Sequence, residues 1–244
     1  MEIIIAIISV IITSVIWIIF FHFKSRQIYE KGKQKGNDEF LELLLLNGYN
    51  AKVNAFRVFN HYSTTGGTVF VGDSITQDYN VYEFFSDMTV YNRGIGGDTT
   101  VGLLKRLDES IYALEPKRIV LLIGTNDFPL LNATCNDVYK NVKRIVSDIK
   151  SKLPNSDIIL ESIYPISKAN NPKIHLLSVG KRDNELIQQT NDLLKTIKGV
   201  IYVDAHSYLK DNDGNLKLDY TVEGLHLNEA GYQKVTEILR KYIS

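Results

Sequence analysis

The sequence predicts a three-layer α/β/α domain with a central parallel sheet of five strands, preceded by an N-terminal transmembrane helix. From residue 68 onward, short apolar runs typical of strands alternate with longer segments of helical periodicity, which is the pattern of βαβ units. A chain of 244 residues with one cysteine has room for one such domain, stabilised by its core and not by disulfides. The predicted organisation is an anchor over 1–23, a basic juxtamembrane and helical linker over 24–63, and the α/β domain over 64–244.

The anchor is predicted from an uncharged apolar run over residues 3–21. A helix of about 20 residues matches the roughly 30 Å hydrocarbon layer of a bilayer. A cleaved signal peptide is the alternative, but it carries a basic segment before the apolar run and small residues at a cleavage site. Here only Met1 and Glu2 precede the run, and Phe20, Phe21 and Phe23 end or follow it. We therefore expect an uncleaved, single-pass anchor.

The charges around the run predict its orientation. Residues 1–36 hold five basic and two acidic side chains, a net charge of +3: Lys24, Arg26, Lys31, Lys33 and Lys35 against Glu2 and Glu30. The positive-inside rule then places the α/β domain on the cytoplasmic side, although the extracellular side stays open. The basic segment either lies against anionic headgroups or is a solvated linker.

Charge and cysteine content narrow the classes of partner. The formal net charge is zero and no basic stripe crosses the α/β domain, which argues against a nucleic-acid partner. Cys135 has no nearby base in the sequence and is expected to be a structural side chain. The expected partner is a small molecule or a lipid.

The elements of the domain follow from the alternation of the two periodicities. The five strands are predicted over residues 68–72, 89–92, 118–124, 157–164 and 200–204. Helices are predicted over 37–60, where Gly48 is a candidate break, and over 99–110, 138–149, 186–197 and 229–242. Residues 165–180 form a long predicted loop, and long loops in compact domains are often functional.

Ser74 stands at the carboxyl end of the first predicted strand, where ligands bind in open parallel sheets. A serine in this place is more often a helix cap than a nucleophile. The surrounding Gly72-Asp73-Ser74 also lacks the second glycine of the G-x-S-x-G nucleophile elbow, which argues against an ordinary α/β-hydrolase.

Two further strand ends carry candidate hydrogen-bond donors for a developing oxyanion. Gly97 offers a backbone N–H unobstructed by a Cβ, and Asn126 offers a side-chain amide. Tight-turn geometry alone would also explain the glycine, and an Asx turn would explain the asparagine. A dinucleotide-binding loop fits poorly, because Thr99 stands where the third glycine of G-x-G-x-x-G belongs.

His226 is the best candidate for a general base among the five histidines. It lies just before the last predicted helix, and Glu223 precedes it by three residues. A carboxylate at this spacing on a loop can turn toward the imidazole and orient it.

These four segments occur together in an order that resembles the GDSL/SGNH hydrolases, a family of serine esterases and lipases. The similar blocks are Gly72-Asp73-Ser74, 92–100, Gly124-Thr125-Asn126-Asp127 and Gly224-Leu225-His226-Leu227-Asn228, within residues 68–242. The glycine-rich second block looks most like that of the platelet-activating-factor acetylhydrolase branch. The resemblance implies a flavodoxin-like three-layer fold that needs no metal or cofactor.

The resemblance also implies a role for each candidate residue. Ser74 would be the nucleophile and His226 the base, and the oxyanion would meet the N–H groups of Ser74 and Gly97 and the amide of Asn126. The family has aspartate where this chain has Glu223. Glutamate reaches roughly 1.5 Å further, so either Glu223 completes a triad with a shifted loop or a backbone carbonyl orients His226 in a dyad.

The resulting prediction is a membrane-anchored serine hydrolase that cleaves carboxylic esters, either acyl or acetyl. An acyl- or acetyltransferase with the same Ser–His pair is one alternative, and a catalytically inactive binding module is the other. The sequence leaves the ester undecided between acetylated sugars, lysophospholipids and other acyl compounds.

Overall fold

The computed structural model describes the backbone of residues 2–243 and the side chains of residues 17, 20–37 and 39–243. The chain forms two compact units, Met1–Asn47 and Gly48–Ser244. We describe each unit separately.

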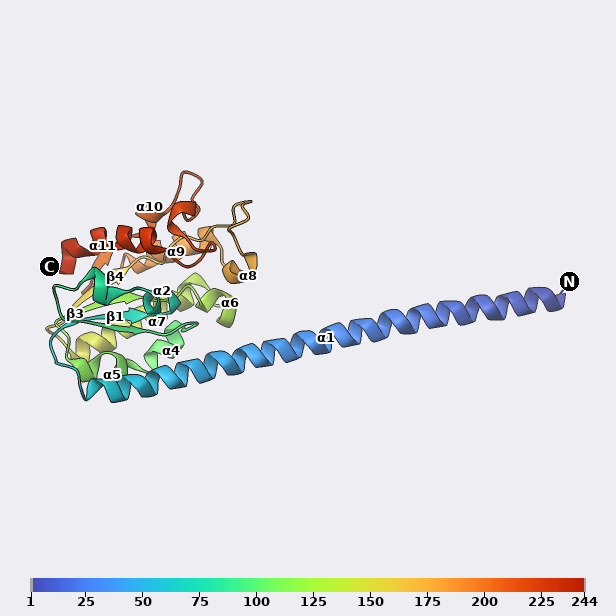
Figure 1. The fold of residues 1–244 in the computed structure, drawn as a ribbon, viewed down its shortest axis with the longest axis horizontal. Helices are drawn as coiled ribbons and strands as arrows, with labels where there is room; N and C mark the ends of the chain where they lie inside the picture. Colours follow the sequence, from blue (N-terminus) through green and yellow to red (C-terminus); the bar gives the residue numbers. More distant parts are fainter. Residues whose placement is uncertain (1, 244) are drawn as a thin grey trace. The chain divides into compact units, whose positions relative to one another are not determined.

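Helix α1 runs from Glu2 to Asn60 without interruption, so the break considered at Gly48 does not occur (Figure 1). Glycine inside a helix costs only about 1 kcal/mol relative to alanine. The favourable neighbours on both sides of Gly48 are enough to carry the helix through it.

The prediction of a transmembrane anchor over residues 1–23 is wrong. In the part of the chain that the structure describes, no helix has the length and apolar character needed to cross a bilayer. The side chains of 1–16, 18 and 19 lie outside the described set, and α1 then carries Lys24, Arg26 and Glu30 within two turns. The predictions of a single-pass membrane protein and of its orientation depended on this anchor and are wrong for the same reason.

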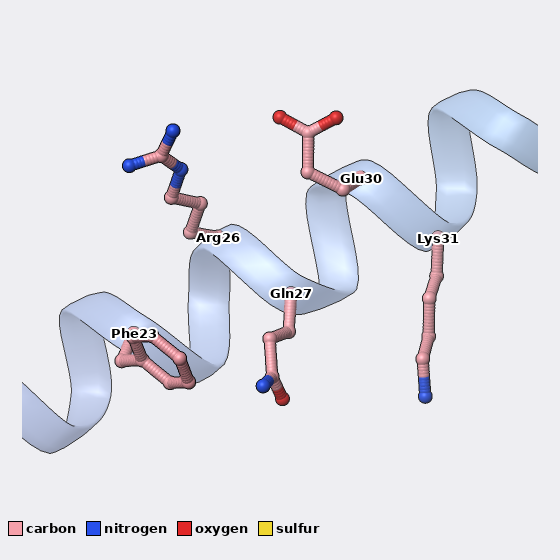
Figure 2. A pocket seen from close by; sticks show the side chains of 5 residues that line it. All are labelled: Phe23, Arg26, Gln27, Glu30 and Lys31. Carbon is pink, nitrogen blue, oxygen red and sulfur yellow. The ribbon is translucent and has the colours of Figure 1, made fainter.

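A hollow on the first unit is lined by Phe23, Arg26, Gln27, Glu30 and Lys31. Figure 2 shows that all five side chains project from one stretch of α1. A ligand in this hollow would meet side chains of a single helix, whereas binding sites for small molecules are concave and enclose most of their ligand. We assign it no function.

The second unit is built on five parallel strands in the order β2-β1-β3-β4-β5. The strands are β1 Thr68–Gly72, β2 Val90–Gly94, β3 Arg118–Leu122, β4 Asp157–Glu161 and β5 Ile201–Val203. This is the flavodoxin-like order, in which the order of strand addition reverses between β1 and β3 and leaves a crevice at their carboxyl ends. The predicted three-layer architecture with a five-stranded parallel sheet is thus confirmed.

Alternate residues of each strand face opposite layers. Val69 and Val71 of β1 pack in one apolar cluster with α4, α5, α7 and α9, whereas Phe70 packs in a second with α2, α3, α10 and α11. Figure 1 shows α10 and α11 on one side of the sheet and α4 and α5 on the other.

The helices of the second unit have these bounds: α2 Ser74–Gln77, α3 Val81–Phe84, α4 Thr100–Leu104, α5 Leu107–Ser110, α6 Asp127–Leu131, α7 Cys135–Lys152, α8 Leu176–Val179, α9 Asn184–Leu194, α10 His206–Leu209 and α11 Glu229–Ile243, with single 3₁₀ turns at Tyr112–Leu114 and Leu218–Tyr220.

Two predicted segments differ in detail from the structure. The helix expected over 99–110 is broken into α4 and α5 at Arg106, whose backbone leaves helical geometry (φ −128°, ψ 21°) and whose guanidinium is fully buried. The loop expected over 165–180 contains the short helix α8. Both departures lie beside the candidate site.

The last turns of α1 belong to the second unit and pack on it. Phe56 is buried with Val53 and Ile95, and the guanidinium of Arg93 lies 4.9 Å from the Phe56 ring centroid. Asn60 accepts a hydrogen bond from Arg93 at 3.0 Å. These contacts hold residues 48–60 against the strand ends that precede the glycine-rich block.

Candidate active site

Ser74 is the first residue of α2, on the turn that follows β1. Gly72 permits this turn, because a Cβ there would lie 2.1 Å from the carbonyl oxygen of Leu122 on the neighbouring strand. Asp73 caps the helix by accepting a hydrogen bond from the N–H of Ile75 at 3.0 Å. The capping role that the sequence allowed for Ser74 therefore belongs to Asp73, and the Ser74 hydroxyl is left for other partners.

The Ser74 hydroxyl, the His226 imidazole and the Glu223 carboxylate form one hydrogen-bonded chain. Ser74 Oγ lies 2.9 Å from His226 Nε2, and His226 Nδ1 lies 2.5 Å from Glu223 Oε1. A carboxylate only accepts hydrogen bonds, so Nδ1 carries the proton and Nε2 is left to accept from the serine hydroxyl. The three side chains come from the two ends of the domain's sequence and meet at the end of the sheet.

The loop before α11 is closed on itself, which positions Glu223. Thr221 Oγ1 donates to the carbonyl of His226 and accepts from the N–H of Gly224, each at 2.8 Å. The carbonyl of Glu223 accepts from the N–H of His175 at 2.9 Å, which ties the loop to the segment before α8. These bonds bring the longer glutamate side chain to the imidazole.

Electrostatics around His226 favour its charged form. The hydrogen bond with Glu223 raises the pKa of His226 above its ordinary value of 6.5, against the opposing effect of burial, and Asp78 and Asp73 raise it further. Burial would raise the pKa of Glu223, but the hydrogen bond and charge of His226 outweigh it and lower that pKa. The pair is therefore arranged to stabilise an imidazolium beside a carboxylate.

Asp73 is a buried carboxyl with an unmet acceptor. Its Oδ2 has no hydrogen-bond partner among the described residues, and burial raises its pKa to about 7, with the bond from Ile75 N–H opposing. Protonation of Asp73 near this pH would remove the free-energy cost of its buried, unpaired charge.

Gly97 and Asn126 follow β2 and β3, the two strands on either side of β1. Gly97 has φ +74°, the left-handed region that glycine adopts without steric cost. Asn126 precedes α6, but its side chain makes no capping hydrogen bond. Its Nδ2 donates to the carbonyl of Asp98 at 2.9 Å, and its Oδ1 accepts from Arg182 at 2.5 Å. The Asx-turn interpretation of Asn126 is therefore excluded.

Arg106 holds the strand ends around the site in register. It pairs with Asp98 at 2.7 Å and donates to the carbonyls of Gly72 and Arg93 at 2.9 and 2.8 Å. Asp127 accepts from the N–H of Thr100 at 3.0 Å, which joins the glycine-rich block to the segment after β3. Burial raises the pKa of Asp127 to about 6, despite that hydrogen bonding.

An open cleft of about 770 Å³ reaches His226 and Glu223. Its other lining side chains include carboxylates, polar groups and apolar rings: Asp78, Asn80, Glu83, Phe84, His175, Ser178, Val222, Leu227, Asn228, Glu229 and Tyr232. No group of three or more metal-ligating side chains occurs within the described residues. The described site brings a serine hydroxyl within hydrogen-bond distance of an imidazole.

Comparison with known proteins supports one family. The sequence profile of the GDSL-like lipase/acylhydrolase family matches residues 70–234. The human platelet-activating factor acetylhydrolase IB subunit alpha2 is 31% identical over 180 residues, which is 72% of this chain and 75% of that protein. The chain belongs to the GDSL-like lipase/acylhydrolase family. It is accordingly a carboxylic ester hydrolase.

Solved structures agree with this assignment. A protein of Streptococcus pneumonia described as a platelet activating factor superposes with a TM-score of 0.77 and 33% identity, over 84% of this chain and 97% of that one. A GDSL-like lipase of Bacteroides thetaiotaomicron superposes with a TM-score of 0.67 and 20% identity, over 78% of this chain and 96% of that one. The second likeness supports the fold alone.

Sequence reasoning missed two buried arginines next to the site. Arg106 follows Leu103 by three residues and directly precedes Leu107, so it lies on the buried face of the predicted helix. This spacing is the sequence signal that could have predicted its burial. Arg182 lies between α8 and α9, where no periodicity marks it. Only the folded chain places Arg182 against Asn126.

Proposed function

We propose that this esterase works by covalent catalysis, with Ser74 as nucleophile, His226 as general base and Glu223 as the acid that orients the imidazole. The continuous hydrogen-bonded chain from Ser74 Oγ through His226 to Glu223 Oε1 is the observation that carries the proposal. A nucleophile, a base and an orienting third group in mutual contact are the signature of an activated serine.

The acylation step follows from these contacts. Nε2 of His226 takes the hydroxyl proton as Ser74 Oγ attacks the ester carbonyl carbon, and the carbonyl oxygen becomes an oxyanion. The imidazolium then returns its proton to the departing alkoxide, which leaves as an alcohol. Water repeats the sequence on the acyl-enzyme and releases the carboxylic acid.

The oxyanion is proposed to lie between the N–H groups of Ser74 and Gly97 and the Nδ2–H of Asn126. The N–H of Ser74 begins helix α2, and the first N–H groups of a helix have no acceptor within it. The switch point between β1 and β3 gathers these donors at one end of the sheet. Preorganised donors of this kind stabilise charge as it develops.

For the substrate we propose an ester of a short acyl group, acetyl first. This rests on the 31% identity to a protein named as an acetylhydrolase. The test is a series of p-nitrophenyl esters from acetate to octanoate, with release of the free acid measured beside nitrophenol. A kcat/KM that falls with chain length supports the proposal, and a kcat/KM that rises with chain length contradicts the acetyl preference.

Asn126→Ala should remove one oxyanion donor and lower kcat by about a hundred- to a thousandfold, equivalent to about 2.7 to 4 kcal/mol of barrier. KM should change little, because the donor acts mainly in the transition state. Steady-state kinetics on p-nitrophenyl acetate measures both. Asn80→Ala is the matched control, since Asn80 lines the cleft that reaches His226 and has no proposed role. Equal activity of Asn126→Ala and the wild type would remove Asn126 from the mechanism.

The pH dependence of kcat/KM should report His226. The base must be neutral, so activity falls as pH drops through the His226 pKa, and the midpoint should lie above 6.5 because that pKa is raised. Asp78→Asn should lower the midpoint, because the Asp78 charge helps to raise the pKa. Glu83→Gln, a change to another cleft carboxylate, should leave it unmoved. A midpoint below 6.5, or one that does not move in Asp78→Asn, would show that another group causes the loss of activity at low pH.

A further inference from the structure

Arg182 is a buried cation whose hydrogen bonds all go to neutral oxygens. It is 5% exposed and lies between α8 and α9. Its Nε donates to the carbonyl and hydroxyl oxygens of Thr125, both at 3.1 Å, and its Nη1 donates to the carbonyls of Ser178 and Val179 at 3.1 and 2.9 Å. Its Nη2 donates to Asn126 Oδ1 at 2.5 Å. No ion pair among the described residues includes Arg182, in contrast to Arg106.

The two partners of the Asn126 side chain determine how its amide is turned. A guanidinium has only donors, so the oxygen must face Arg182, and the carbonyl of Asp98 only accepts, so the nitrogen must face Asp98. Both constraints require the same orientation. One Nδ2–H is used by Asp98 and the other remains for a ligand oxygen. An amide turned by 180° would present a carbonyl to the oxyanion and repel it.

The charge on Arg182 acts on the same amide. A charged donor on Oδ1 draws electron density from the amide and strengthens its N–H groups as donors, since hydrogen bonds in a chain polarise one another. Burial lowers the pKa of Arg182, whereas Asp73 and Glu223 raise it. The cation therefore lies within the electrostatic field of the nucleophile's turn and of the catalytic carboxylate.

We propose that Arg182 is a positioning residue for the oxyanion site, which orients and polarises the Asn126 amide so that its free N–H meets the developing charge. This inference rests on the proposed function. The competing explanation is a purely structural role, in which Arg182 only fastens the segment after β3 to the end of α8.

A double-mutant cycle separates the two roles. Arg182→Gln should lower kcat on p-nitrophenyl acetate by about ten- to a hundredfold, part of the effect of losing the donor itself, with KM nearly unchanged. In the Asn126→Ala background the same change should lower kcat by less than about threefold, because residues that act as a unit are not additive. An equal loss in both backgrounds, or no loss in the first, would overturn the proposal.

Two further measurements keep the result independent of folding. Asn191→Ala removes another buried side chain with several hydrogen bonds, none of which goes to Asn126. It should lower the unfolding temperature yet leave kcat intact below that temperature. Arg182→Ala should regain kcat when guanidinium ion is added, and the Arg182→Ala/Asn126→Ala double variant should not. If guanidinium ion rescued the single and the double variant equally, or rescued neither, Arg182 would have a structural role only. If wild-type protein released no acid from any ester, the proposed function itself would fail, which is a distinct outcome.

Discussion

Ser74→Ala should lower kcat by roughly a millionfold, the loss that follows removal of the nucleophile from a serine triad. The hydroxyl lies 2.9 Å from the base, and no other described side chain makes a hydrogen bond to His226 Nε2. The residue lies on a turn whose geometry is held by Gly72 and Asp73, so the variant should fold. Initial rates on p-nitrophenyl acetate, with the unfolding temperature as a check, measure the effect.

Ser178→Ala is the matched control for this loss. Ser178 lines the cleft that reaches His226, and its hydrogen bond from Arg182 goes to the backbone carbonyl. Its hydroxyl should therefore be dispensable, with kcat within about twofold of the wild type. A Ser74→Ala variant that retained a tenth of the wild-type rate would exclude Ser74 as the nucleophile.

Glu223→Gln should lower kcat by about ten-thousandfold, the effect of replacing the triad acid by its amide. Burial opposes the charge of Glu223, but its hydrogen bond is the largest cause of the raised His226 pKa. The amide would remove the negative charge beside the imidazolium and would allow the other imidazole tautomer. The acid limb of the pH profile should then move to lower pH, because the His226 pKa falls.

Glu83→Gln provides the control, since it removes a carboxylate that lines the same cleft, whereas the described hydrogen bonds of the His226 imidazole go to Ser74 and Glu223. Its kcat should stay near that of the wild type. Activity of Glu223→Gln within a fewfold of the wild type would point to a Ser–His dyad, with the carboxylate reduced to holding the loop.

Local patterns in the sequence predicted most of the fold. The strand over 68–72 agrees with β1, and the predicted strand over 118–124 begins with β3 and extends two residues beyond it. Strands of this kind are buried on both faces and appear as continuous apolar runs, which is a strong signal. The order of the strands carried no such signal, because it depends on which strands pair across the sheet.

Four segments at strand ends and before α11 indicated the candidate site, and the chain folds Ser74, His226 and Glu223 into contact. The least certain residue of the predicted site was Glu223, because its side chain is longer than the aspartate of the family and the sequence allowed either a triad or a Ser–His dyad. The loop closed by Thr221 brings the Glu223 carboxylate to the imidazole, and that closure involves backbone positions that no side-chain pattern reveals.

Arg182 marks the limit of sequence reasoning at the site. An arginine in a loop is normally a solvated side chain, and only the approach of the segments after β3 and α8 buries it. Arg106 could have been suspected from its position on an apolar helical face. The apolar run over 3–21 shows the opposite error, since composition alone predicted a membrane span that the described residues do not support.

The most direct test of Ser74 as nucleophile is to map the site of covalent modification by a fluorophosphonate. The reagent should react with the intact protein at one site, and mass spectrometry of its peptides should place the phosphonyl group on Ser74. Ser74→Ala should remain unlabelled, and Asn126→Ala should label more slowly. A phosphonyl group on another residue, or persistent labelling of Ser74→Ala, would contradict the account.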